Sequence, residues 1–147
     1  PRADRSRFQV EFDWVGTTDP SALLVIPTAI EHLGDLIDGG WPAIWDRHKR
    51  QALAARELLC SALDVPEPSP PDMIAALASV PLPPGDPDAP AGVWDLDPMQ
   101  QVLFETHAIE VPIMAWPAPP ARVLRVSAQL YNTLQPYRDL AQILARD

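Results

Sequence analysis

The side chains with the clearest chemical potential lie in the nonapeptide Arg125 to Thr133, which reads Arg-Val-Ser-Ala-Gln-Leu-Tyr-Asn-Thr. Apolar and polar residues alternate here, which is typical of a strand with one buried face. Leu124, Val126 and Ala128 would face the core, and Arg125 would stand on the opposite, polar face. An arginine side chain can hold a carboxylate through two parallel hydrogen bonds. Arg125 is therefore a candidate carboxylate ligand.

A second polar segment, Gly16-Thr17-Thr18-Asp19, directly precedes Pro20. Aspartate followed by proline indicates a helix start, because the carboxylate caps the helix and proline has the backbone angle of the first turn. Backbone N–H groups and hydroxyls at such a start can bind phosphate. Gly16, Thr17 and Thr18 are thus candidate phosphate ligands, whereas the negative charge of Asp19 assigns it to capping.

Other residues that could bind metals or act as nucleophiles are scattered along the chain. His32, His48 and His107 lack the mutual spacing of metal ligands, so we expect no metal site. Cys60 lies inside a predicted helix, where we expect a small buried residue. Lys49 is the one lysine and lies among charged residues of the same predicted helix, with no apolar pocket that would activate its amine.

Composition limits the class of protein. A chain of 147 residues with 47% apolar content suits one compact domain. The formal charge of −9 argues against a nucleic-acid partner. We find no apolar run long enough to cross a bilayer and no signal-peptide pattern, so we expect a cytoplasmic protein without a membrane partner. Because the chain starts at Pro1 without an initiator methionine, we expect a processed or partial protein.

Hydrophobic periodicity predicts the elements that position these residues. The alternation from Phe8 to Trp14 predicts an extended segment. Two helices should follow, one from Pro20 to Gly39-Gly40 with an interruption at Pro27 and one from Trp41 to Leu63 whose exposed face carries Arg47, Lys49, Arg50 and Arg56. The remaining expected elements are a strand over 73–80 (a helix is the alternative), a short helix opened by Asp97-Pro98, strands over 109–115 and around Arg125, and a closing helix over 137–144 capped by Asn132 or Thr133.

The order of these elements predicts an α+β fold, with a few-stranded antiparallel sheet covered by helices. The last two strands are joined by a short proline-rich turn and should pair antiparallel. We expect residues 1–19 to form an extended N-terminal segment with the Gly-Thr motif. Residues 20–147 should form a single domain.

Several motifs resemble class V aminotransferases, which are fold-type I enzymes dependent on pyridoxal phosphate. The nonapeptide is similar to their C-terminal motif Arg-x-Ser-x-x-x-Tyr-Asn-Thr, and Trp14 with Gly16-Thr17 resembles a Trp-x-Gly-Thr-x-Asp segment of the isopenicillin N epimerase-like branch. The similarity extends from about Phe12 to the C-terminal helix. It includes residues 39–42, 73–83 and 109–112.

The resemblance implies that the chain is the small C-terminal domain of such an enzyme. Arg125 would hold the α-carboxylate of an amino-acid substrate. Thr17, or alternatively Thr18, would contact the cofactor phosphate of a neighbouring subunit, so the complete enzyme should be a homodimer. Ser127, Tyr131 and Asn132 would shape the strand-to-helix turn.

The same resemblance implies that essential parts lie outside the chain. The Schiff-base lysine of the family belongs to a large domain that the chain lacks, and Lys49 is rejected for that function. The isolated chain should therefore be inactive, with no catalytic residue of its own and no bound pyridoxal phosphate.

The resemblance leaves several reactions open. Epimerisation by proton abstraction at Cα is the first expectation, and an aminotransferase or a C–S lyase is the alternative within the enzyme class. Cysteine desulfurase chemistry is disfavoured, because the loop from Leu82 to Leu96 lacks the cysteine that those enzymes carry there. Outside the enzyme class, the alternative is a stand-alone interaction or regulatory domain.

Overall fold

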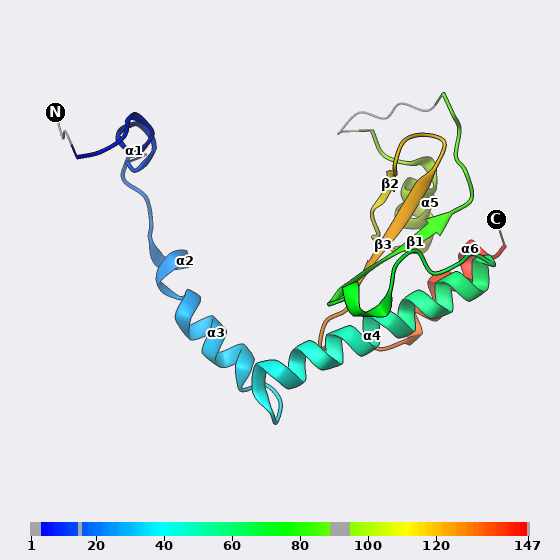
Figure 1. Ribbon diagram of the computed structural model, residues 1–147, viewed down its shortest axis with the longest axis horizontal. Coiled ribbons are helices and arrows are strands. Elements are labelled where there is room, and N and C mark those ends of the chain that lie inside the picture. Colours follow the sequence, from blue (N-terminus) through cyan, green and yellow to red (C-terminus); the bar gives the residue numbers. More distant parts are fainter. Residues whose placement is uncertain (1–3, 15, 89–94, 147) are drawn as a thin grey trace. The chain divides into compact units, whose positions relative to one another are not determined.

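The computed structural model describes residues 4–14, 16–88 and 95–146. It divides into two compact units, unit 1 (residues 1–40) and unit 2 (residues 41–147). The elements in chain order (Figure 1) are α1 (Arg7–Phe12), α2 (Ser21–Leu24), α3 (Ile26–Gly34), α4 (Gly40–Leu63), a 3-10 turn η1 (Pro71–Met73), β1 (Leu77–Leu82), α5 (Pro98–His107), β2 (Ile113–Ala115), β3 (Arg122–Ser127) and α6 (Gln135–Leu144). None of the helices in these described ranges is long and apolar enough to cross a membrane.

The first element of unit 1 corrects the sequence prediction, because α1 is a helix where an extended segment was expected. Ser6 and Gln9 form a capping box, in which each side chain accepts a hydrogen bond from the backbone N–H of the other residue. Arg7 and Glu11 add an ion pair one helical turn apart. With no strand to pair with, the alternating residues satisfy their backbone groups locally, so the period-two pattern was misleading.

The helix predicted from Pro20 to Gly39-Gly40 is divided in two, α2 and α3. Pro27 lies in the first turn of α3, where its missing N–H costs no helical hydrogen bond. The interruption expected at this proline is therefore confirmed. The second helix ends at Gly34, and Gly39 and Gly40 take positive φ angles in the turn that leads into α4.

The two compact units meet at residue 40 and differ in burial. Among the described residues, no side chain of unit 1 is buried, and all buried side chains lie in unit 2. The expected division into an N-terminal segment over residues 1–19 and a single domain over residues 20–147 stays a prediction.

Unit 2 confirms the α+β fold. Its sheet has three strands in the order β1-β3-β2, and both pairings are antiparallel, including the predicted pairing of β2 with β3. Apolar side chains of the strands pack with those of α4, α5 and α6 in one core. Its members are Ala52, Ala55, Leu59, Cys60, Ala78, Val80, Leu82, Leu103, Ile113, Leu124, Val126, Ala128, Tyr137, Leu140, Ala141 and Leu144.

The outer strands are shifted or shorter relative to the prediction. The strand expected over 73–80 is present as β1, but it begins later, because residues 71–73 form η1. It continues through Pro81, which is tolerated because β1 is an edge strand. β2 covers only the last part of the predicted strand over 109–115. The loop predicted over 82–96 lies partly outside the described residues.

The long helix α4 is confirmed. Its buried residues are Ile44, His48, Ala52, Ala55, Arg56, Leu59 and Cys60, whereas Trp45 is exposed. Arg56, predicted on the solvated face, is only 1% exposed. Its guanidinium donates to a Glu67 carboxylate oxygen at 2.6 Å and to the Ser69 carbonyl at 2.9 Å. This arginine therefore fastens the chain after α4 to the helix.

The caps of the last two helices were predicted with mixed success. Asp97 caps α5 as expected, by accepting a backbone N–H of the first turn. The expected cap of α6 by Asn132 or Thr133 is wrong, because Leu134 occupies the N-cap position and makes no side-chain bond there. The Asn132 side chain instead accepts the N–H of Gln129 at 2.9 Å, so it stabilises the turn that leaves β3.

Candidate functional site

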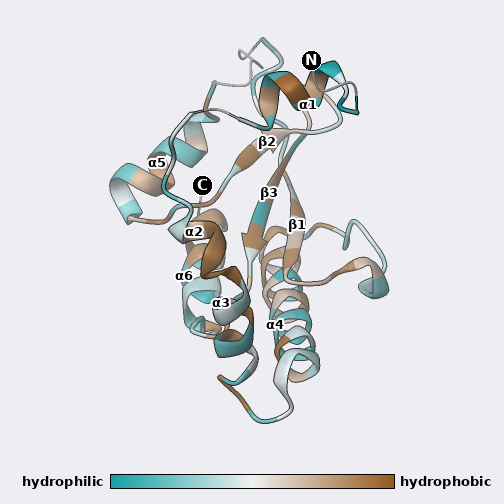
Figure 2. Ribbon diagram, turned by 90° about the vertical axis from the view of Figure 1, so that its left-hand side faces the viewer, coloured by the Kyte–Doolittle hydropathy of each residue, from teal (hydrophilic) through white to brown (hydrophobic). Residues whose placement is uncertain are grey.

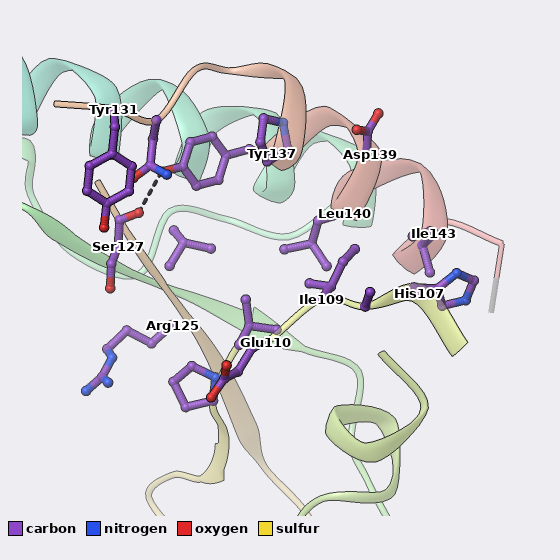
Figure 3. Close-up of a pocket in the computed structure, with 16 residues that line it drawn as sticks. His107, Ile109, Glu110, Arg125, Ser127, Tyr131, Tyr137, Asp139, Leu140 and Ile143 are labelled. Atoms are coloured by element: carbon purple, nitrogen blue, oxygen red, sulfur yellow. Dashed lines mark hydrogen bonds between the residues drawn. The ribbon is translucent and has the colours of Figure 1, made fainter. Parts of the chain in front are cut away.

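A cavity of about 570 Å³ lies in unit 2 beside the central strand β3 (Figure 3). Three parts of the chain enclose it: the end of α5 with the loop that follows, β3 with its exit turn, and α6. The lining residues are His107, Ala108, Ile109, Glu110, Val111, Pro112, Arg125, Val126, Ser127, Tyr131, Asn132, Pro136, Tyr137, Asp139, Leu140 and Ile143. The volume is in the range that suits a small-molecule ligand.

Arg125 lies on this cavity, on the exposed face of β3, while its neighbours Leu124 and Val126 are buried on the other face. The alternation predicted from the sequence is therefore confirmed. Figure 3 shows the guanidinium at the margin of the cavity, extended away from Ile109 and Leu140. No described residue forms an ion pair or a side-chain hydrogen bond with Arg125. Its guanidinium fork is therefore available to an external anion.

The other arginine of β3 is in the opposite situation. Arg122 donates from Nη1 to both carboxylate oxygens of Asp97, at 2.8 and 2.9 Å, and from Nε to the carbonyl of Pro83 at 2.9 Å. Its ion pair is largely shielded from solvent. Arg122 therefore has a structural function, and the contrast within one strand makes the unpaired state of Arg125 notable.

The turn residues next to Arg125 divide into supporting and accessible groups. Tyr137 donates from its hydroxyl to the Ser127 carbonyl at 2.6 Å, and burial is the main cause that raises the pKa of this tyrosine. Asn132 holds the turn as described above. Tyr131 is 83% exposed, so its ring does not contribute to the core. In Figure 3 Tyr131, Ser127 and Arg125 lie along the same margin of the cavity.

The sequence analysis missed three ionisable residues that line the cavity, His107, Glu110 and Asp139. All three are exposed. Their positions depend on how α5, its following loop and α6 converge, and no local sequence pattern predicts that convergence. They give the cavity a mixed charge around the Arg125 guanidinium.

The predicted phosphate ligands belong to unit 1. Gly16 has φ of +99°, a value that glycine adopts without strain, and Thr17 and Thr18 are exposed in the connection between α1 and α2. Asp19 accepts both the hydroxyl and the backbone N–H of Ser21, and these two bonds lower its pKa. Asp19 therefore binds the first residue of α2, but the expected cap is not formed, because Pro20 occupies the N-cap position and α2 has no side-chain cap.

This donor set fits a phosphate only as a supplementary contact. The hydroxyls of Thr17 and Thr18 can donate to phosphate oxygens, but the Asp19 charge disfavours an anion at the α2 terminus itself. These residues can therefore assist in binding a phosphate that other groups hold. Their contact with a cofactor stays a prediction.

The remaining candidates from the sequence do not join the cavity. Lys49 is partly buried on α4, and Cys60 is buried in the core, where burial first and the nearby Glu67 second raise the pKa of its thiol. A thiol with a raised pKa is a poor nucleophile at neutral pH. Within the described ranges, no group of three or more histidine, cysteine, aspartate or glutamate residues could hold a metal ion.

Comparison with known proteins adds a direct finding. The chain is 31% identical over 150 residues to the "Probable L-cysteine desulfhydrase, chloroplastic" of Arabidopsis thaliana. It is 27% identical over 157 residues to the "Putative L-cysteine desulfhydrase 2" of Oryza sativa subsp. japonica. No protein-family model matches the chain.

These matches cover 94% and 93% of this chain but only 30% and 32% of the two relatives. The chain therefore spans about a third of the length of the curated relatives it matches. Neither relative is named as an isopenicillin N epimerase, so the comparison does not support that branch. The Arabidopsis relative is described as chloroplastic, and the cytoplasmic location expected for this chain stays a prediction.

Proposed function

We propose that this chain is the carboxylate-binding part of a pyridoxal phosphate-dependent enzyme that cleaves the C–S bond of L-cysteine. The observation that carries the proposal is Arg125, which lines the cavity without an internal partner and lies in an Arg-x-Ser-x-x-x-Tyr-Asn-Thr sequence. The names of the two relatives favour C–S bond cleavage over epimerisation or amino-group transfer.

The chemical contribution of the chain is substrate orientation. Arg125 would hold the α-carboxylate of the amino acid through two charge-assisted hydrogen bonds. Pyridoxal phosphate, when bound, supplies the electron sink for breaking a bond at Cα of the amino acid. Because the carboxylate is fixed at one end of the substrate, its position determines which bond at Cα is aligned for cleavage.

The proposed reaction consumes water and conserves the redox state. Cα of L-cysteine loses its proton, the C–S bond breaks, and the sulfur leaves as hydrogen sulfide. Water then replaces the amino group, so the nitrogen leaves as ammonia and the organic product is pyruvate. No residue of this chain is assigned to the proton transfer.

The rest of the active site would come from a second part of the enzyme. A lysine for the cofactor is not supplied by Lys49, which lies on α4 and does not line the cavity. About 70% of the length of the two relatives lies outside the match, which is enough for a large cofactor-binding domain. In the complete enzyme, a homodimer, Thr17 would add its hydroxyl to the phosphate site of the neighbouring subunit.

A chimeric enzyme tests the proposal. This chain replaces the matching segment of the Arabidopsis relative, and hydrogen sulfide and pyruvate released from L-cysteine are measured. Arg125→Ala should lower kcat/KM roughly 100-fold, because losing charge-assisted hydrogen bonds to the carboxylate costs about 3 kcal/mol. Arg138→Ala is the matched control, since Arg138 is exposed on α6 and does not line the cavity.

The products separate the competing functions. Equal release of sulfide and pyruvate supports C–S cleavage, whereas D-cysteine without sulfide would support the epimerase expectation. A chimera that folds and binds pyridoxal phosphate but transforms no amino acid would favour the stand-alone interaction domain. Equal activity of Arg125→Ala and Arg138→Ala would remove Arg125 from substrate binding.

A further inference from the structure

Unit 1 exposes large apolar side chains on α2, on α3 and on the residues beside these helices. Seven large apolar side chains of this segment are between 42% and 72% exposed, namely Leu23, Leu24, Val25, Ile26, Ile30, Leu33 and Leu36. In Figure 2, α2 and the first part of α3 carry the brown colour of hydrophobic residues. Contiguous apolar patches of this kind on a surface mark interaction sites.

Several of these apolar side chains lie on one face of α3. Ile26, Ile30 and Leu33 follow the spacing of four and three residues that places them on one side of α3. Thr28 and Glu31 fall on the opposite side, which is polar. We call the first set, together with Leu23, the apolar stripe. Because the helix is amphipathic, the stripe is a defined face and not a general exposure of apolar residues.

The apolar stripe does not belong to a core within its own unit. Among the described residues 4–14 and 16–40, none is buried. The core cluster consists entirely of residues from 52 to 144. A helix of nine residues whose apolar side is hydrated is marginal by itself, since most helical stability in proteins comes from packing of the apolar face. The stripe therefore needs a packing surface outside unit 1.

We infer that the apolar stripe is the docking surface for the folded domain that corresponds to the unmatched two thirds of the relatives. The match to the Arabidopsis relative covers 94% of the chain, so only about nine residues at the ends lie outside it and α3 lies within it. The stripe is thus part of a sequence region that, in the relatives, is joined to a much larger polypeptide. This inference rests on the proposed function, because it assumes that such a domain exists. It does not depend on which reaction the complete enzyme catalyses.

The size of the stripe favours this occupant over a second copy of the chain. A stable dimer of separate chains needs about 800 Å² and some 20–30 residues on each side. The four residues of the stripe, and also all seven exposed apolar residues of this segment, fall short of that number. Contacts between domains of one polypeptide can be smaller, because the covalent connection gives a high effective concentration.

Two substitutions distinguish the docking face from the rest of α3. Ile26→Glu and Thr28→Glu place the same carboxylate in the first turn of α3, where the helix dipole tolerates it in both cases. They differ in the face that receives the charge, because only Ile26 belongs to the stripe. Thr28→Glu is therefore a matched control for helix stability and net charge.

Amide hydrogen exchange over residues 21–36 gives the readout, for the isolated chain and for the chimera with the Arabidopsis relative. We expect exchange in this segment to be at least tenfold slower in the chimera than in the isolated chain. Ile26→Glu should remove that protection or prevent soluble accumulation of the chimera, and Thr28→Glu should do neither. If the chimera does not accumulate, this chain is instead mixed with the separately expressed remainder of the relative. The two polypeptides should then co-elute in gel filtration, and a lack of co-elution overturns the inference.

Other outcomes also decide the matter. Equal exchange in the chimera and the isolated chain would overturn the inference, as would equal effects of the two substitutions. An isolated chain that is dimeric by light scattering, and monomeric after Ile26→Glu, would assign the stripe to a second copy. The readout is independent of sulfide release, so a docked but inactive chimera would contradict the proposed function alone.

Discussion

At the scale of single residues, the environment of a charged side chain decides its function more than its type does. Arg122 and Arg125 lie on the same strand, three positions apart, and so face opposite sides of the sheet. Arg122 is bound by Asp97, whereas Arg125 has no described partner and lines a cavity. The same principle corrects Arg56, which is buried and forms an ion pair with the partly exposed Glu67, although Arg47 and Arg50 on the same helix are exposed.

The two residues with burial-raised pKa values, Cys60 and Tyr137, predict how stability depends on pH. Below the ordinary thiol pKa of about 8.5 both groups are protonated in the folded and unfolded chain, so their contribution is fully present. At higher pH the unfolded chain releases these protons first and is thereby favoured. The free energy of unfolding should therefore fall from about pH 9 upwards, by at most about 1.4 kcal/mol per pH unit for each group.

Urea unfolding between pH 7 and pH 11 measures this decline. Tyr137→Phe should make it shallower, and Tyr131→Phe, at a tyrosine that is 83% exposed, is the control substitution. A decline that is equally steep in both variants would show that Tyr137 does not titrate as its burial requires.

At the scale of elements, Asp97 connects the start of α5 to β3. Its carboxylate caps the helix and also accepts both hydrogen bonds from Arg122. We expect Asp97→Ala to lower the free energy of unfolding by about 2–4 kcal/mol, since it removes a cap worth about 1 kcal/mol and a shielded ion pair. Asp97→Asn should lower the free energy of unfolding less, because asparagine keeps the helix cap and loses only the ion pair with Arg122.

Urea unfolding of the two variants, alone and combined with Arg122→Ala, separates the two contributions. The ion-pair contribution should disappear in the Arg122→Ala background, and the cap contribution should persist. If Asp97→Asn is as destabilising as Asp97→Ala in both backgrounds, the capping bond does not stabilise α5.

The elements that the sequence predicted well are those with strong and consistent local patterns. The spacing of three and four residues in α4, the alternation in β3 and the Asp-Pro start of α5 each specify one structure. The predictions failed where the outcome depends on a partner. The alternating segment around Phe8 to Trp14 forms α1, and the described residues of unit 1 contain no strand with which it could pair. The cap of α6 depends on a turn in which the Asn132 side chain is already bonded to Gln129.

The candidate site was predictable only in part, for the same reason. Arg125 follows from its strand and motif, but His107, Glu110 and Asp139 join the cavity through tertiary packing. Arg56 offered a signal that was not used, since it continues the four-residue spacing of His48 and Ala52 on the buried side of α4. An acidic partner just after the helix, Glu67, completes that pattern.

At the scale of the whole molecule, the two units differ in how they are stabilised. Unit 2 contains the entire core of the described residues, and unit 1 contributes no buried side chain. We therefore expect residues 41–147 alone to have the same free energy of unfolding as the full chain, within about 0.5 kcal/mol. Urea unfolding followed by circular dichroism checks this, and a loss of more than about 2 kcal/mol on removal of residues 1–40 would show that unit 1 supports the core.

The central claim is that Arg125 recognises the carboxylate of an amino-acid substrate. The most direct measurement compares kcat/KM of the chimeric enzyme for L-cysteine with that for L-cysteine amide, which lacks the negative charge. The wild-type sequence should prefer L-cysteine, and Arg125→Ala should reduce this preference roughly 100-fold, while Arg138→Ala preserves it. A preference for L-cysteine that is unchanged in Arg125→Ala would contradict the account.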